Sequence, residues 1–325
     1  MQRYAGVLFV VLAAAMWGLT GSVAFYCMQQ GMAPIEVSFW RNLLAGALFC
    51  LYALSNRSLY VRSARDGCAI LMFGALCIAG MNICYQTGVK TGGAALTSVL
   101  TYTAPVWVAI IARFVFKELL SPRKIGALSL SLVGVSLLGF SGVTTGGEAG
   151  LTPIGLGLLA GFFYSLLFLF TKAYLDRCTV FTLYGLAMLA AACALFPFVD
   201  FMPEKTPRVW LHLLFLAVFC SCVAFWAYSE GLKRMPVIRV SVIASFDPMI
   251  AMFVAWLWWG EAFSPTGWMG AFASVMAVLF IVTERERKAC PVAEAEQPSE
   301  IFVCTETERP AEALAYKPQL ATGNG

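Results

Sequence analysis

The sequence has little charge and almost no histidine. Of its 325 residues only 12% are charged, and His212 is the one histidine. Soluble domains carry about 25% charged residues, so this composition excludes an ordinary soluble domain. The 11 cysteines contain no CxxC pair and no carboxylate cluster accompanies His212. We therefore expect no disulfide framework, no metal site and no cofactor.

Long apolar runs make up most of the chain. Hydrophobic residues account for 60% and the mean hydropathy is +0.78, which indicates an integral membrane protein. Apolar runs of about 20 residues, long enough to cross a bilayer, predict ten membrane-spanning helices. They lie at 5–27, 34–55, 68–87, 94–116, 123–142, 153–173, 180–200, 209–230, 238–260 and 266–283. The first run also resembles a cleavable signal after Arg3, but it continues to Cys27, which favours an uncleaved helix.

The two halves of the chain repeat each other at an offset of 143 residues. Without a gap, the offset pairs Tyr85 with Tyr228, Ser98 with Ser241, Pro105 with Pro248, Glu118 with Glu261, and Ser121 with Ser264. Each copy holds an odd number of predicted spans, so the copies must have opposite orientations in the membrane. The sequence therefore predicts an all-α polytopic membrane protein of ten transmembrane helices in two inverted-topology five-helix repeats, 1–142 and 143–283, before a disordered cytoplasmic tail, 284–325.

Lysine and arginine are distributed unevenly along the predicted topology. If the N-terminus is cytoplasmic, 16 of the 22 lie on the inner side or just after the last span. The outer loops hold Lys90, Lys205 and Arg208 alone. This bias predicts cytoplasmic N- and C-termini in the inner (plasma) membrane. The net charge of +4 follows from it, and no nucleic-acid-binding pattern is present. The expected partners are the lipid bilayer and a small-molecule substrate, with the protein as monomer or homodimer.

Small residues recur at four-residue spacing in the first and sixth spans. They are Ala14, Gly18 and Ser22, and at the same positions plus 143, Gly157, Gly161 and Ser165. Such stripes let helix backbones approach closely within a membrane, so we interpret them as packing seams.

Each repeat also carries a glutamate ahead of a Ser-Pro pair. Ser121 and Ser264 are suited to cap the N-terminus of the helix that follows each of them. Glu118 and Glu261 lie at the C-terminal ends of the fourth and ninth spans, where the helix dipole disfavours an acid. We expect them to bind the backbone at the start of the next helix, with a gating role as the alternative.

Pro105 and Pro248 lie deep in the fourth and ninth spans. Each removes a backbone donor, so the carbonyl four residues earlier, at Thr101 or Ala244, loses its helical partner. Interrupted helices at matching places in inverted repeats favour a binding site at the membrane midplane. The alternative is a kink that serves packing only.

Polar and aromatic side chains around these helix breaks form the predicted substrate site. Its members are Trp17, Arg41, Asn82, Tyr85, Gln86, Thr101, Tyr102, Tyr228, Ser245 and Asp247, with Tyr164 as a further candidate. Asp247 lies about 15 Å from either end of its span, where an ionised carboxylate costs at least ~2.5 kcal/mol. It must be paired, protonated or in contact with water, and we predict that it couples transport to an ion. Arg41 either pairs with it or extends to the membrane interface.

These motifs resemble those of a known family. Trp17, Gly18, Arg41 and the segments VLTYTAPVW from Val99 and SVIASFDPMI from Ser241 are similar to the EamA-like family of the drug/metabolite transporter superfamily. The likeness covers residues 4–283. It implies ten helices in inverted repeats, a central cavity, and efflux or exchange of metabolites such as amino acids, often proton-linked. Members frequently have glutamate where this chain has Asp247, so reach and substrate geometry differ here.

Residues and resemblance together predict a secondary-active transporter rather than an enzyme. We expect an exporter or exchanger of small polar metabolites such as amino acids or related compounds, acting by alternating access, with proton coupling as an option. A structural membrane subunit is one alternative, for which midplane carboxylates and broken helices would have no use. An intramembrane transferase is another, and it would need companions that His212 lacks.

Overall fold

The computed structural model describes residues 2–92, 94–118, 120–141, 151–259 and 264–283. Regular structure in these segments is helical throughout. The elements are α1 (Gln2–Gln29), α2 (Pro34–Ser55), α3 (Ala64–Met72), η1 (Phe73–Ile78), α4 (Ala79–Gly92), α5 (Ala94–Thr101), α6 (Ala104–Val115), α7 (Pro122–Ser141), α8 (Leu151–Tyr174), α9 (Val180–Leu195), η2 (Phe196–Phe198), α10 (Pro207–Ala217), η3 (Val218–Val223), α11 (Ala224–Leu232), α12 (Val237–Ala244), α13 (Asp247–Trp259) and α14 (Pro265–Val282). The predicted tail, 284–325, lies outside the described residues.

Eight helical stretches in the described residues are long and apolar enough to cross a membrane. They coincide with eight of the ten predicted spans, which confirms an all-helical, multi-pass membrane protein. The ninth predicted span, 238–260, corresponds to α12 and α13. It is divided into pieces of 8 and 13 residues, just as the fourth span is divided into α5 and α6, and its last predicted residue lies outside the described residues. The fifth predicted span corresponds to α7. Arg123 and Lys124 lie at the start of this helix, and serines are spaced along it.

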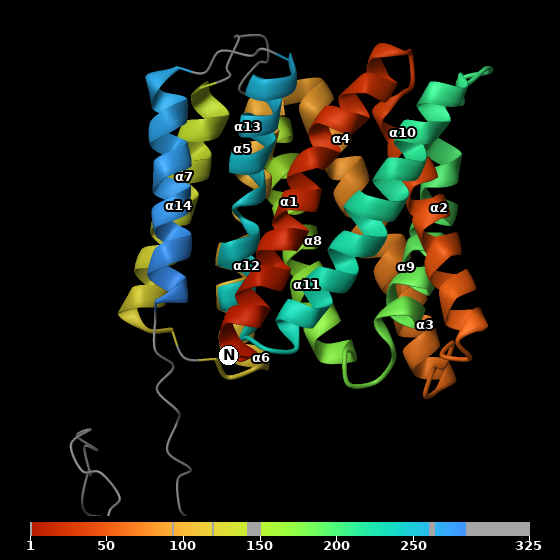
Figure 1. Ribbon diagram of the computed structural model, residues 1–325, viewed down its shortest axis with the longest axis horizontal. Helices are drawn as coiled ribbons and strands as arrows, with labels where there is room; N and C mark the ends of the chain where they lie inside the picture. Colours follow the sequence, from red (N-terminus) through yellow and green to blue (C-terminus); the bar gives the residue numbers. More distant parts are fainter. Residues whose placement is uncertain (1, 93, 119, 142–150, 260–263, 284–325) are drawn as a thin grey trace, which may run out of the picture. The chain divides into compact units, whose positions relative to one another are not determined.

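The helices run side by side between two ends of the bundle (Figure 1). We call the end at which α1 begins the N face; α6 and α12 lie toward this end. The labels of α5 and α13 lie toward the other end, which we call the opposite face. Each broken helix pair, α5–α6 and α12–α13, therefore extends from one face to the other with its break in between.

The small-residue stripes of α1 and α8 face the two broken helices. A Cβ added at Gly18 of α1 would lie 2.8 Å from the carbonyl oxygen of Asp247. A Cβ added at Gly161 of α8 would lie 2.9 Å from the carbonyl oxygens of Leu100 and Thr101. The stripes are thus packing seams, as predicted, and the backbone they approach is that of the breaks.

Replacing Gly161 by alanine should destabilise the protein by about 1–3 kcal/mol, the usual cost of overpacking a close contact. The added Cβ would press on two main-chain oxygens that cannot move without shifting the end of α5. Gly155→Ala on the same helix is the matched control, since a Cβ there meets nothing within 4 Å. Thermal unfolding of the purified variants measures the difference. Equal melting temperatures for the two variants would contradict this packing.

Two π-helical turns interrupt the long third and eighth spans. η1 joins α3 to α4, and η3 joins α10 to α11. Within η1, Gly74 is so close to the main chain of Ala187 on α9 that a Cβ would overlap the Ala187 carbonyl group. The wider π-helical turn therefore lies where the main chain of this helix packs directly against the main chain of α9.

The serines before α7 and α14 cap these helices as predicted. Ser121 Oγ accepts a hydrogen bond from the Lys124 N–H at 3.1 Å. Ser264 Oγ accepts one from the Gly267 N–H at 3.4 Å. Both helix starts are therefore fixed by local sequence.

A buried ion pair, which we call the brace, joins the start of α2 to the segment before α10 at the opposite face. Glu36, in the first turn of α2, is 0% exposed, and its Oε1 lies 2.7 Å from Lys205 Nζ in the segment before α10. Trp40 Nε1 donates to the same oxygen at 3.2 Å, and the Met202 N–H donates to Oε2 at 3.1 Å. The Lys205 ammonium also lies 5.5 Å from the Trp40 ring centroid, within cation–π distance.

Candidate functional site

Both proline-containing spans are broken where the sequence predicts. Two non-helical residues separate α5 from α6, and two separate α12 from α13. Pro105 and Pro248 then lie in the first turn of α6 and α13. A proline costs no hydrogen bond in a first turn, because those N–H groups have no helical acceptor. The prolines therefore fix where the second piece of each helix begins.

Asp247 is the first residue of α13 and is 7% exposed. The positive end of the helix dipole favours a carboxylate there. The hydroxyl of Tyr102, from the break between α5 and α6, is its hydrogen-bonding neighbour. Its Oδ1 is buried without a hydrogen-bond partner in the described part of the chain. The two breaks therefore meet at a carboxyl group with one acceptor unused.

Three tyrosines surround this carboxyl group. Tyr102, Tyr85 on α4 and Tyr164 on α8 all lie within electrostatic range of Asp247. The Tyr85 hydroxyl also shares a hydrogen bond of 3.0 Å with Ser98 Oγ on α5. Tyrosines from α4, from α8 and from the break between α5 and α6 thus lie around the acid.

Pairing with Asp247 is one of the two alternatives predicted for Arg41, and the structure shows no such ion pair between the described residues. The Arg41 Nε donates instead to Ser221 Oγ at 3.1 Å, because the η3 turn presents that buried hydroxyl to α2. Tyr164 lies within electrostatic range of both Arg41 and Asp247. Tyr164 therefore connects the surroundings of Arg41 with those of Asp247.

Trp17 and Tyr228 lie together in an aromatic cluster beside this neighbourhood. The Trp17 ring centroid is 5.5 Å from that of Tyr228 and 5.3 Å from that of Phe225. Phe168 links Tyr228 to Tyr164, with centroid separations of 5.3 and 5.1 Å. Tyr228 is 0% exposed, so this end of the cluster is sealed.

The remaining predicted residues mostly bond to their own helices. The donors are Asn82 Nδ2 to Ile78 O at 2.8 Å, Thr101 Oγ1 to Thr97 O at 2.8 Å, and Ser245 Oγ to Ser241 O at 3.0 Å. Gln86 is partly buried on α4. Asn82, Thr101 and Ser245 thus each donate to a nearby main-chain carbonyl, and none of these hydrogen bonds reaches Asp247.

A hydroxyl pair that the sequence did not predict lies next to the aromatic cluster, since the Tyr184 ring centroid is 4.5 Å from that of Phe225. Thr171 Oγ1 and Tyr184 Oη share a hydrogen bond of 2.7 Å, and both residues are fully buried. The Tyr228 hydroxyl lies near this pair but makes no hydrogen bond of normal geometry. The repeat could have indicated Tyr184, because the 143-residue offset places it at the position equivalent to Arg41, which is a predicted site residue.

Glu118 binds a different helix from the one predicted. Its Oε1 accepts from the Val237 N–H at 2.9 Å and its Oε2 from the Ile238 N–H at 3.4 Å. These groups begin α12, not the next helix, α7. The start of α7 is capped by Ser121 instead. Glu261, its repeat counterpart, lies outside the described residues.

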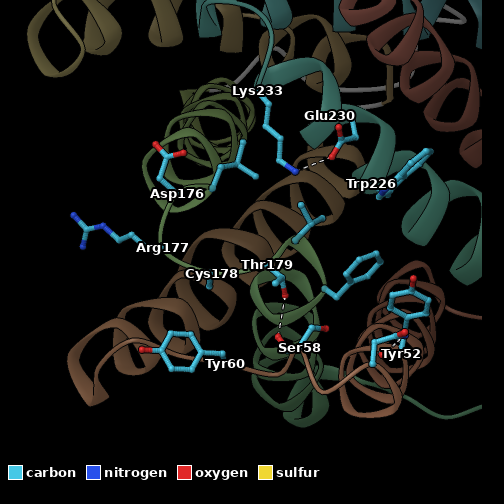
Figure 2. A pocket seen from close by; sticks show the side chains of 14 residues that line it. Tyr52, Ser58, Tyr60, Asp176, Arg177, Cys178, Thr179, Trp226, Glu230 and Lys233 are labelled. Atoms are coloured by element: carbon cyan, nitrogen blue, oxygen red, sulfur yellow. Dashed lines mark hydrogen bonds and ion pairs between the residues drawn. The ribbon is translucent and has the colours of Figure 1, made fainter.

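A separate open pocket of ≈ 640 Å³ lies where the ends of α2, α8 and α11 come together (Figure 2). Lys233 and Glu230 form an ion pair of 2.7 Å across its rim, and Thr179 Oγ1 donates to Ser58 O at 3.2 Å. None of the predicted substrate-site residues lines it. The pocket is therefore distinct from the Asp247 site.

The described residues include no group of three or more His, Cys, Asp or Glu that could hold a metal ion. His212 stacks on Tyr26 with ring centroids 4.0 Å apart. Its Nδ1 lies 2.7 Å from Arg208 O on its own helix. The histidine thus has a packing role.

A bundle of membrane-spanning helices, with two broken helices meeting at a buried acid, defines a polytopic membrane transporter. The model of the EamA-like transporter family matches residues 4–140 and 151–283. The chain belongs to this family.

Two relatives are named as transporters, and a solved structure shares the fold. The uncharacterized transporter YwfM of Bacillus subtilis is 25% identical over 287 residues, covering 86% of this chain and 94% of that protein. The uncharacterized inner membrane transporter YicL of Salmonella typhimurium is 23% identical over 298 residues, covering 87% and 97%. One crystal structure has the same fold, with a TM-score of 0.72 at 17% identity over 86% of this chain and 96% of the other.

Proposed function

We propose that the protein is a secondary-active transporter that exports or exchanges small zwitterionic metabolites, such as amino acids, by alternating access. The observation that carries the proposal is the Asp247 carboxyl group, buried at the meeting point of two helix breaks with Oδ1 unpartnered. A buried acceptor without a partner costs about 1–3 kcal/mol. An unpartnered buried acceptor is kept in a protein where a ligand or a proton supplies the missing hydrogen bond.

The proposed architecture is ten spans in two inverted repeats, 1–142 and 143–283. Its support is the double match of the family model and the placement of both breaks at prolines 143 residues apart. We further propose that the N face is cytoplasmic and the membrane is the plasma membrane. The distribution of lysine and arginine supports this orientation.

The charges around the site fit a substrate that carries both an ammonium and a carboxylate group. Asp247 would bind the ammonium group, and the tyrosines near it could add cation–π contacts. Arg41 would bind the carboxylate, leaving Ser221 as it does so. A proton and an ammonium group would compete for the same Asp247 oxygens. That competition is the basis proposed for exchange of proton against substrate.

Two measurements in sequence test this function. Metabolites are compared between cells that lack the protein and cells that overproduce it. The compounds that change are then added to the purified protein, since a ligand at 100 times its Kd should stabilise it by about 2.7 kcal/mol. We expect zwitterions among the stabilising compounds, with counterflow in proteoliposomes. A broad panel that neither stabilises nor exchanges would overturn the proposal.

Arg41→Gln should remove the preference for a substrate carboxylate. The wild-type protein should bind an amino acid at least about tenfold more tightly than the matching amine, because hydrogen bonds to charged groups contribute about 1.5–3 kcal/mol. The variant should bind the two about equally in competition assays in proteoliposomes. Arg113→Gln, which removes an exposed arginine from α6, is the control. An unchanged preference in Arg41→Gln would exclude Arg41 from the site.

A further inference from the structure

The start of α12 is capped from the other half of the chain. Pro236, the residue before this helix, provides no side-chain cap. The Glu118 carboxylate supplies it, through hydrogen bonds of 2.9 and 3.4 Å from the N–H groups of Val237 and Ile238. A carboxylate at a helix N-terminus satisfies unpaired donors and interacts favourably with the helix dipole. One side chain of the α6–α7 connection thus holds the helix that leads to Asp247.

Glu118 is itself fixed in place. Lys117 has a left-handed conformation, with φ 53°, and turns the chain out of α6. The Glu118 N–H then bonds back to Ala112 O at 3.3 Å. The carboxylate is therefore presented by a rigid turn of α6.

A lysine holds the other side of the same connection. Lys172 Nζ on α8 lies 2.8 Å from Leu232 O and 3.5 Å from Met235 O, at the end of α11 and in the turn that follows. Lys172 and Glu118 are within electrostatic range of each other. Two charged side chains therefore hold the turn from α11 to α12. Lys172 binds its carbonyl groups, and Glu118 binds the N–H groups at the start of α12.

The two ends of the site are closed to different degrees. Toward the N face, α12 packs on α6. The 143-residue offset relates α12 to α5 and α6 to α13, so α5 and α13 are the equivalent pair at the opposite face. Within the described residues, these two helices show no comparable packing. Equivalent side chains differ in the same sense: Ser241 is 1% exposed and Tyr228 0%, whereas Ser98 and Tyr85 are partly exposed. The N-face half is therefore the more tightly packed one, and we take it as the closed half.

We propose that Glu118 is the latch of this closed half. Its carboxylate holds α12 against α6 while the Asp247 site faces the opposite face, and it releases α12 when the site turns to the N face. This role rests on the alternating access proposed above. Glu118 is a positioning residue, because it acts on the site through α12 and touches no substrate.

A pair of reporter cysteines at repeat-related positions tests the latch. Ser98→Cys on α5 and Ser241→Cys on α12 are introduced one at a time in the full chain, and the purified protein is treated with N-ethylmaleimide. Mass spectrometry of the peptide that contains each reporter separates its labelling from that of native cysteines. In the parent protein, the cysteine at position 98 should label faster, since Ser98 is partly exposed and Ser241 is 1% exposed.

Glu118→Ala should reverse this pattern. Labelling at position 241 should rise about tenfold and labelling at position 98 should fall, because losing two charge-assisted hydrogen bonds shifts a two-state equilibrium by at least that factor. Glu118→Gln keeps one acceptor oxygen and should give a smaller shift of the same sign. It keeps the test decisive if the alanine variant does not fold. Asp176→Asn removes an exposed carboxylate that also lies near Lys172, and should change neither rate.

Two outcomes would overturn the latch. Labelling at position 241 that stays at the parent rate in both Glu118 variants is one. Faster labelling at both positions is the other, since it reveals a loosened fold and not a shift between two closed ends. The readout needs no substrate. A reversed pattern without transport of any compound would reject the proposed substrates but keep the latch and the alternating access on which it rests. Transport with unchanged labelling at both positions would reject the latch and keep the proposed function.

Discussion

Asp247→Asn should abolish proton-driven substrate uptake into inverted membrane vesicles. Asparagine keeps the shape of the side chain but can neither carry the negative charge nor exchange a proton. Binding of the substrate ammonium group should weaken about 10–150-fold, because a hydrogen bond to a charged group contributes about 1.5–3 kcal/mol. A pH gradient should then no longer raise the internal substrate concentration above the external one. Uptake with and without the gradient, measured in the same vesicles, gives the result.

Two variants make this result specific to Asp247. Asp200→Asn removes an exposed carboxylate just after η2 and should leave uptake unchanged. Asp247→Glu retains the charge on a chain one methylene longer and should preserve proton dependence with an altered affinity. Uptake by Asp247→Asn that still follows the pH gradient would show that the coupling group lies elsewhere.

Lys205→Met should destabilise the protein by about 3–5 kcal/mol, the typical cost of removing one partner of a buried ion pair. The cost arises because Glu36, at 0% exposure, would keep its charge without its cation. Its remaining donors, the Trp40 indole and the Met202 N–H, are neutral. Thermal unfolding of the purified protein should show a large fall in melting temperature.

The double variant Glu36→Gln/Lys205→Met should recover much of this loss, since no charge then remains buried. Lys233→Met is the matched control: its ion pair with Glu230 is open to solvent, with the lysine side chain 44% exposed. Such exposed pairs contribute about 0–1 kcal/mol. A fall for Lys205→Met no greater than that for Lys233→Met would show that the brace contributes little.

Local signals in the sequence predicted the framework of the site. The prolines located both helix breaks, and the glycine stripes located the surfaces that pack against them. These features depend on a residue and its immediate neighbours. The sequence also singled out Asp247, because a carboxylate far from either end of a span has few innocuous explanations.

The partners of charged side chains could not be predicted in the same way. Glu118 binds a helix 119 residues further along the chain, and Arg41 binds Ser221, 180 residues away. Such distances in sequence carry no periodicity. Charge suggested Asp247 as a partner of Arg41, but the Arg41 Nε donates to a serine whose position depends on the π-helical turn η3.

The turns η1 and η3 also determine which neighbours Tyr85 and Tyr228 meet. A π-helical turn holds one residue more than an α-helical turn, so side chains beyond it are rotated by about 100° from their places in an uninterrupted α-helix. A helical wheel drawn through the whole third or eighth span therefore assigns these tyrosines to the wrong side. The contacts of Tyr85 with Ser98 and of Tyr228 with Trp17 depend on that extra residue. Chain length within η1 and η3 thus matters as much as residue identity.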